Sequence, residues 1–91
     1  MKKSIRLTIS GSLHEHFFKD FVLKKANEVG VKGFVRTKEP SIIEVFLEGQ
    51  DTEVQIALAS IKDAPKYARI REFSIKEEKF QDFKDFKIFN F

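Results

Sequence analysis

The 91-residue chain contains no cysteine, no tryptophan, two prolines and four glycines. Because cysteine is absent, no disulfide can add to the stability of so small a protein. No apolar run approaches the roughly 20 residues that a membrane helix needs. Charged Arg6 interrupts the chain start, where a signal peptide would need its apolar core. We therefore expect a cytoplasmic protein without a membrane segment.

The chain is instead rich in phenylalanine, with eleven residues, and hydrophobic residues make up 42% of it. This is enough for one aromatic-rich core, and two domains would not fit, so we expect a single domain spanning residues 1–91. The formal net charge is +3, and charges of both signs alternate along the chain. This pattern favours a solvated mixed-charge surface over a nucleic-acid-binding one.

Hydrophobic periodicity predicts five strands and two helices. The strands are expected over residues 3–10, 33–38, 42–48, 67–75 and 86–91. Helical spacing begins at Phe17 and ends at Gly30, after a predicted loop over residues 11–16. Asp51 or Thr52 is expected to cap a second helix, with a capping box over residues 52–55 in support, and residues 63–65 are expected to end it.

The element order is βαββαβ with a fifth strand added. Two similar βαβ halves without a linker predict one α+β sandwich of the ferredoxin-like type. Its sheet should be mostly antiparallel and five-stranded, with both helices on one face. Because this layout hosts many unrelated functions, it does not decide the function of this chain.

Two segments are more specific: Gly-Ser-Leu-His-Glu-His-Phe-Phe-Lys over residues 11–19 and Gly-Phe-Val-Arg-Thr over residues 33–37. They resemble the phosphate loop and the second-strand motif of the acylphosphatases, small hydrolases of carboxyl-phosphate bonds. The similarity covers nearly the whole chain and is closest over residues 26–36. It implies the sheet order 4-1-3-2-5 and hydrolysis of acyl phosphates without a metal or other cofactor.

In that family, backbone N–H groups of the loop and the start of the following helix hold the phosphate. By resemblance, the anion-binding loop here comprises Leu13, His14, Glu15, His16, Phe17, Phe18 and Lys19. The family places an arginine at the loop end to grip the phosphoryl group and an asparagine on the second strand to orient the attacking water. The corresponding catalytic positions are Lys19 and Thr37, both substituted. The implied ligands are inorganic phosphate, sulfate or a small phosphorylated molecule.

These substitutions predict impaired chemistry. Lys19 keeps the positive charge but lacks the planar fork of a guanidinium. Thr37 offers one hydroxyl on a stiff stem, and misplacing a reacting group by about 1 Å can cost on the order of 10²-fold in rate. The structural alternatives are a solvated lysine in the first helical turn and an ordinary β-strand threonine.

Glu15 stands where the family has glycine. A left-handed backbone there would cost roughly 1–2 kcal/mol. An inward carboxylate would repel a bound anion by roughly 3 kcal/mol. His14 and His16 flank Glu15, but no cysteine or third histidine completes a zinc site, so we expect no metal.

We favour an acylphosphatase-like pseudoenzyme with weak or lost activity and a residual anion-binding loop. An active acylphosphatase is the first alternative, and a protein-interaction or RNA-binding module is the second. RNA is disfavoured because the first strand has no aromatic residue and the third has only Phe46.

The C-terminal region carries five phenylalanines, at positions 80, 83, 86, 89 and 91. We expect Phe86 and Ile88 to pack on the core, while Phe80 and Phe83 cover a sheet edge. With these side chains packed, we expect a monomer. The alternative is that the phenylalanines form an exposed aromatic patch, through which this edge would form a dimer.

Overall fold

The computed structural model describes residues 1–12, 15–63 and 69–89, apart from the Glu15 side chain. Its elements are β1 (Lys2–Ser12), α1 (Glu15–Val29), β2 (Lys32–Glu39), β3 (Ile42–Gln50), α2 (Asp51–Lys62), β4 (Arg69–Glu77) and β5 (Phe86–Phe89). The strand order is β4-β1-β3-β2-β5. Every neighbouring pair is antiparallel except β2 with β5. The predicted ferredoxin-like α+β fold and sheet order are confirmed.

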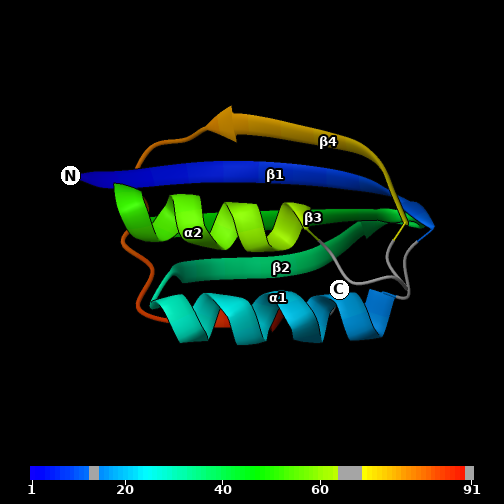
Figure 1. Ribbon diagram of the computed structural model, residues 1–91, viewed down its shortest axis with the longest axis horizontal. Helices are drawn as coiled ribbons and strands as arrows, with labels where there is room; N and C mark the ends of the chain where they lie inside the picture. Colours follow the sequence, from blue (N-terminus) through cyan, green and yellow to red (C-terminus); the bar gives the residue numbers. More distant parts are fainter. Residues whose placement is uncertain (13–14, 64–68, 90–91) are drawn as a thin grey trace.

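Both helices cover one face of the sheet (Figure 1). Alternate residues of the central strands point toward them, because successive side chains of a strand face opposite ways. Fully buried side chains from the sheet and both helices form the core, among them Ile5, Leu7, Ile9, Phe18, Val22, Val35, Ile43, Val45, Leu47, Val54 and Ile61. Phe86 is also buried and Ile88 packs against this core, as the sequence predicted.

Two predicted boundaries near the helix starts are wrong. β1 continues through Ser12 and α1 begins at Glu15, so residues 11–12 and 15–16 of the predicted 11–16 loop belong to these two elements. The capping box of α2 also lies earlier than predicted, because β3 runs directly into the helix and its last residue, Gln50, is the N-cap. Its backbone N–H donates to Glu53 Oε1 over 3.2 Å. Residues 67–68 of the predicted fourth strand lie outside the described residues.

The sheet face away from the helices is covered at one end by the segment 78–85, which connects β4 to β5. Phe83 packs its ring against Phe34 and Phe46, with centroids 5.7 and 5.3 Å away. Phe34 in turn stacks on Phe89 at 5.1 Å. The expectation that Phe83 covers a sheet edge is therefore wrong, since Phe46 belongs to the central strand. β3 is consequently buried on both faces.

None of the helices in the described part of the chain is long and apolar enough to cross a membrane.

Candidate anion-binding site

The two motifs each begin with a glycine that the sheet requires. Gly11 has φ 153°, and a Cβ there would lie 2.0 Å from the Arg69 carbonyl oxygen of β4. Gly33 has φ 137°, and a Cβ there would lie 1.8 Å from the Phe46 carbonyl oxygen of β3. Neither approach leaves room for a side chain. Both glycines therefore have a structural reason that involves no ligand: they let neighbouring strands approach closely at the two motifs.

The sheet register places Thr37 near the start of α1. Thr37 of β2 and Ile9 of β1 are both paired with Ile43 of β3, so the three residues form one row across the sheet. β1 and β2 run in the same direction, since both are antiparallel to β3, and they end where α1 begins (Figure 1). Thr37 also shares the helix-covered face with buried Val35, two residues earlier.

Lys19 is the fifth residue of α1, and its side chain is half-buried. It follows Phe18, which is fully buried and anchors the first turn of the helix in the core. α1 packs over β2 and β5. The fold therefore carries Lys19 and Thr37 to the same end of the sheet, on its helix-covered side.

The other expected loop residues have different environments. His16 is 84% exposed, with Nε2 3.6 Å from Asp20 Oδ2, and Phe17 is 61% exposed. These two side chains face solvent, so they offer a ligand at this helix end mainly backbone groups. Leu13 and His14 lie outside the described residues.

Glu15 does not carry the backbone strain that its replacement of glycine suggested. It is the first residue of α1 and has helical geometry, so the expected left-handed conformation is wrong. Extension of the helix by two residues relative to the prediction is the physical reason. Within the expected anion-binding loop, the backbone N–H groups of residues 15–18 thus belong to the first turn of α1, where N–H groups have no acceptor within the helix.

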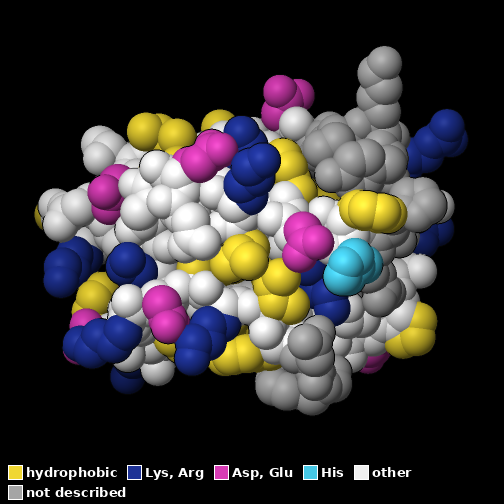
Figure 2. All heavy atoms as spheres, turned by 90° about the horizontal axis from the view of Figure 1, so that it is seen from below, with side chains coloured by type: hydrophobic (Ala, Val, Ile, Leu, Met, Phe, Trp, Pro, Cys, Tyr) yellow, Lys and Arg dark blue, Asp and Glu magenta, His cyan; other side chains and the backbone are white. Residues whose placement is uncertain are grey.

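Charged groups of both signs surround this helix. The view from the α1 side shows dark blue and magenta side chains interspersed with yellow ones, with no single basic patch (Figure 2). In the first six residues of α1, Lys19 is accompanied by the acids Glu15 and Asp20. Within the described residues, no three His, Asp or Glu side chains are grouped so that they could hold a metal ion.

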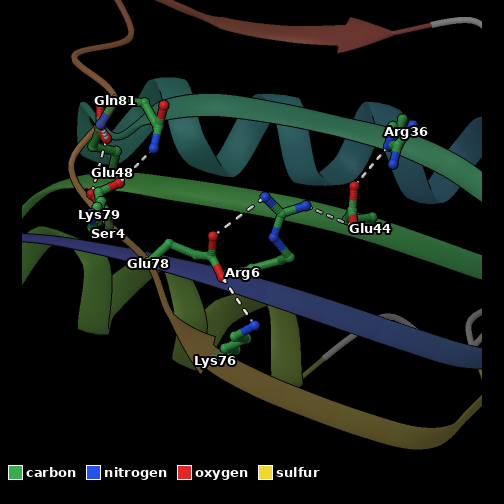
Figure 3. Close-up of polar contacts among 9 residues, drawn as sticks. All are labelled: Ser4, Arg6, Arg36, Glu44, Glu48, Lys76, Glu78, Lys79 and Gln81. Atoms are coloured by element: carbon green, nitrogen blue, oxygen red, sulfur yellow. Dashed lines mark hydrogen bonds and ion pairs between the residues drawn. The ribbon is translucent and has the colours of Figure 1, made fainter.

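A charged cluster that the sequence did not predict lies on the opposite sheet face (Figure 3). Glu44 is buried and accepts a hydrogen bond from Arg36 Nε at 2.7 Å, while Arg6 lies 2.9 Å away. Burial alone would raise the pKa of Glu44, but hydrogen bonds and charge from Arg36 and Arg6 outweigh it and lower the pKa below 4.5. Glu44 therefore stays ionised and holds both arginines.

Glu48 is a second buried carboxylate, 1% exposed. It accepts hydrogen bonds from Ser4 Oγ at 2.9 Å, from the Phe83 backbone N–H at 2.8 Å and from the Gln81 backbone N–H. It thereby fastens the 78–85 segment to the sheet. In the sequence, apolar Phe46 stands between these two acids on the same face of β3. Its presence there was the one available sign that this face is covered rather than exposed to solvent.

The family model and the curated relatives point to the same family. The model of the family described as Acylphosphatase matches residues 5–88. An acylphosphatase of Pyrobaculum aerophilum is 33% identical over 82 residues, covering 88% of this chain and 86% of the relative. An acylphosphatase of Archaeoglobus fulgidus is 21% identical over 85 residues, covering 93% and 96%.

A solved structure of an acylphosphatase from Coxiella burnetii superposes with a TM-score of 0.87 at 25% identity, covering 96% of this chain and 92% of that one. The family model spans nearly all of the sheet and both helices. This chain belongs to the acylphosphatase family.

Proposed function

We propose that this protein is an acylphosphatase relative with weak or lost hydrolysis of acyl phosphates and a residual anion-binding site at the start of α1. The proposal rests on one observation. The sheet register brings Thr37 to the end of the sheet where α1 begins with Lys19 in its second turn. These are the two positions at which the family resemblance requires asparagine and arginine.

The remaining groups suit anion binding better than catalysis. N–H groups in the first turn of α1 and the positive end of its dipole favour a phosphate. Half-buried Lys19 adds a positive charge, which acts as a point charge rather than a fork. Catalysis in such a site depends on positioning and charge stabilisation. Loss of the arginine guanidinium and of the asparagine amide should therefore lower the hydrolysis rate more than the affinity for phosphate.

The acids near Lys19 also weaken the site for an anion. Glu15 begins the helix, and Asp20 directly follows Lys19. A carboxylate close to a bound phosphate repels it by a few kcal/mol at an effective dielectric of about 20. We therefore expect phosphate affinity in the millimolar range and a ligand that is inorganic phosphate or a small phosphorylated molecule. We also propose a cytoplasmic location, with which a chain free of cysteine is compatible.

An assay with a small acyl phosphate such as acetyl phosphate tests this proposal. The variants are Lys19→Arg, Thr37→Asn and the double substitution, with the Pyrobaculum aerophilum relative assayed beside them. We expect kcat/KM of the wild type to lie at least about 10²-fold below that of the relative. The double variant should recover roughly 10²-fold, and the single variants should recover less, because the two groups act as a unit.

Lys24→Arg/Thr52→Asn is the matched control, since both residues are exposed and lie elsewhere on the helices. It should leave the rate unchanged. Wild-type turnover comparable to that of the relative would overturn the proposal. A double variant that gains nothing would show that these two positions do not account for the low rate. Adding Glu15→Gly to the double variant then tests the acidic residue.

The first alternative is an active acylphosphatase, which the names of the relatives favour. The same assay separates the two functions, because an active enzyme needs no substitution. An RNA-binding module has less support, since Phe46, the aromatic residue of the third strand, is 1% exposed beneath Phe83.

A further inference from the structure

We propose that the free edge of β4 pairs antiparallel with β4 of a second copy of this chain. β4 is the outermost strand beside β1, and no described element lies on its other side (Figure 1). It is nine residues long and contains no proline. Its Ile75 side chain is 48% exposed on the helix-covered side. Such an edge presents a row of backbone donors and acceptors to another strand.

Hydrogen bonding with β1 fixes which β4 groups point outward. The Glu78 backbone N–H donates to the Ser4 carbonyl oxygen over 2.9 Å. In an antiparallel pair, the residues that bond to the neighbour alternate along the strand. Lys76 and Ser74 therefore face β1 with their N–H and C=O groups. The groups of Phe73, Ile75 and Glu77 point away from the sheet, toward a partner strand.

One register makes this edge complementary to itself. With a two-fold axis at Ser74, Phe73 lies opposite Ile75 of the second copy, and the outward groups of both residues can pair. Glu72 then lies opposite Lys76 of the second copy. By symmetry each contact occurs twice, so two apolar and two opposite-charge contacts form. Arg71, which lies in β4 beside the register shift with β1, would then be opposite Glu77 of the second copy.

Neighbouring registers lose this match. An axis at Phe73 places Arg71 opposite Ile75, and an axis at Ile75 places Glu72 opposite Glu78. The first sets a charge against an apolar side chain, and the second sets two acids together. Directly opposed like charges destabilise strand pairing, whereas opposite charges and apolar pairs stabilise it. The side-chain pattern therefore selects the axis at Ser74.

The same pairing of side chains explains why Lys76 on the β4 edge does not prevent dimerisation. A lysine on an edge strand usually hinders pairing, because a second strand would bury its charge. Here Glu72 is placed to meet that charge in the favoured register only. The β5 edge is a poorer candidate, since it is four residues long and its Phe86 is used in the core. The partner that fits the β4 edge best is thus a second copy.

The interface is small, so we expect a weak dimer, with Kd on the order of 10⁻⁴ M. Sedimentation velocity over a concentration series measures it. Ile75→Pro removes one outward N–H without removing a bond to β1, and proline is tolerated at such edge positions. We expect this variant to remain monomeric and folded by circular dichroism. A wild type that stays monomeric to about 1 mM, or a dimer that survives Ile75→Pro, would overturn the proposal.

Charge reversal tests the register without relying on proline. Glu72→Lys and Lys76→Glu each place like charges opposite one another in their own dimers, so each should dimerise roughly tenfold more weakly than the wild type. An equimolar mixture restores opposite charges at both contacts and should recover wild-type affinity as a mixed dimer. Lys24→Glu, an exposed charge reversal on α1, should have no effect. Failure of the mixture to recover affinity would exclude this register.

Discussion

Arg36 donates its Nε–H to Glu44 Oε1 over 2.7 Å, on the face of β2 opposite to its neighbour Thr37. Arg6 reaches the other oxygen of the same carboxylate from β1. β1, β2 and β3 are thus joined by side chains directly behind the strand end that carries the candidate site. This cluster fixes the strands without touching a ligand on the helix-covered side.

The lowered pKa of Glu44 makes stability depend on pH. The folded protein binds a proton at this carboxyl less readily than the unfolded chain does, so the ion cluster stabilises the fold above the unfolded pKa near 4.5. This contribution disappears as the pH falls through the lower folded pKa. We expect Glu44→Gln to be less stable than the wild type at neutral pH and to lose less stability on acidification. Urea unfolding from about pH 7 to about pH 3 measures both. Glu39→Gln, at an exposed position, should follow the wild type.

Glu48→Gln should loosen the 78–85 segment. The Glu48 carboxylate accepts hydrogen bonds from one hydroxyl and two backbone N–H groups. In glutamine an NH₂ group replaces one of the two oxygens, and it cannot accept a hydrogen bond from any of these donors. We expect amide hydrogen exchange at Gln81 and Phe83 to accelerate by roughly 10-fold or more, with a loss of about 1–3 kcal/mol in stability. Unchanged exchange at these two amides would contradict the fastening role. Glu28→Gln on the surface of α1 is the control.

Gly33→Ala should be far more damaging than Gly49→Ala. A Cβ at Gly33 lies 1.8 Å from the Phe46 carbonyl oxygen, so β2 and β3 must separate. At Gly49 the nearest atom is Glu53 Oε1 at 3.3 Å, the end of a flexible side chain. We expect the first variant to lose several kcal/mol, on the order of the whole margin of a small domain, and the second to lose about 1 kcal/mol or less. Thermal unfolding compares them, and equal losses would count against the close strand approach.

Inorganic phosphate should stabilise the wild type weakly through Lys19. At a phosphate concentration about tenfold above a millimolar Kd, the gain is roughly 1.4 kcal/mol. Lys19→Gln should reduce this gain, whereas Lys24→Gln should retain it. Thermal unfolding in phosphate, against sodium chloride of equal ionic strength, measures the difference. Equal gains in the two variants would show that the ion acts elsewhere or without a site.

The sequence predicted the elements where one face of a strand or helix is apolar. Ile5, Leu7 and Ile9 alternate, and Phe18, Val22 and Ala26 recur at helical spacing, and all of them are buried. The start of α1 was predicted two residues late because Glu15 and His16 carry no apolar signal. The α2 capping box was misplaced because the usual preference for threonine at a cap favoured Thr52 over Gln50.

The covered back of the sheet was not predicted, because its contacts join residues far apart in the chain. Glu44 and Glu48 look like solvent-facing strand residues, yet their partners lie on β1, on β2 and in the 78–85 segment. For the candidate site, element order and register suffice to bring Lys19 and Thr37 to one end of the sheet. Their roles depend on the family resemblance, since the placement of a water at the ångström level is not encoded in hydrophobic periodicity.

The position of the 78–85 segment also sets an order of folding events. Phe83 docks on Phe34 and Phe46, and its backbone bonds to Glu48, 35 residues away. This docking surface exists only after β2 and β3 have paired, and closing so long a loop is slow. During refolding the rings of Phe34 and Phe46 are thus exposed for a time, and we expect aggregation to compete with folding in that interval.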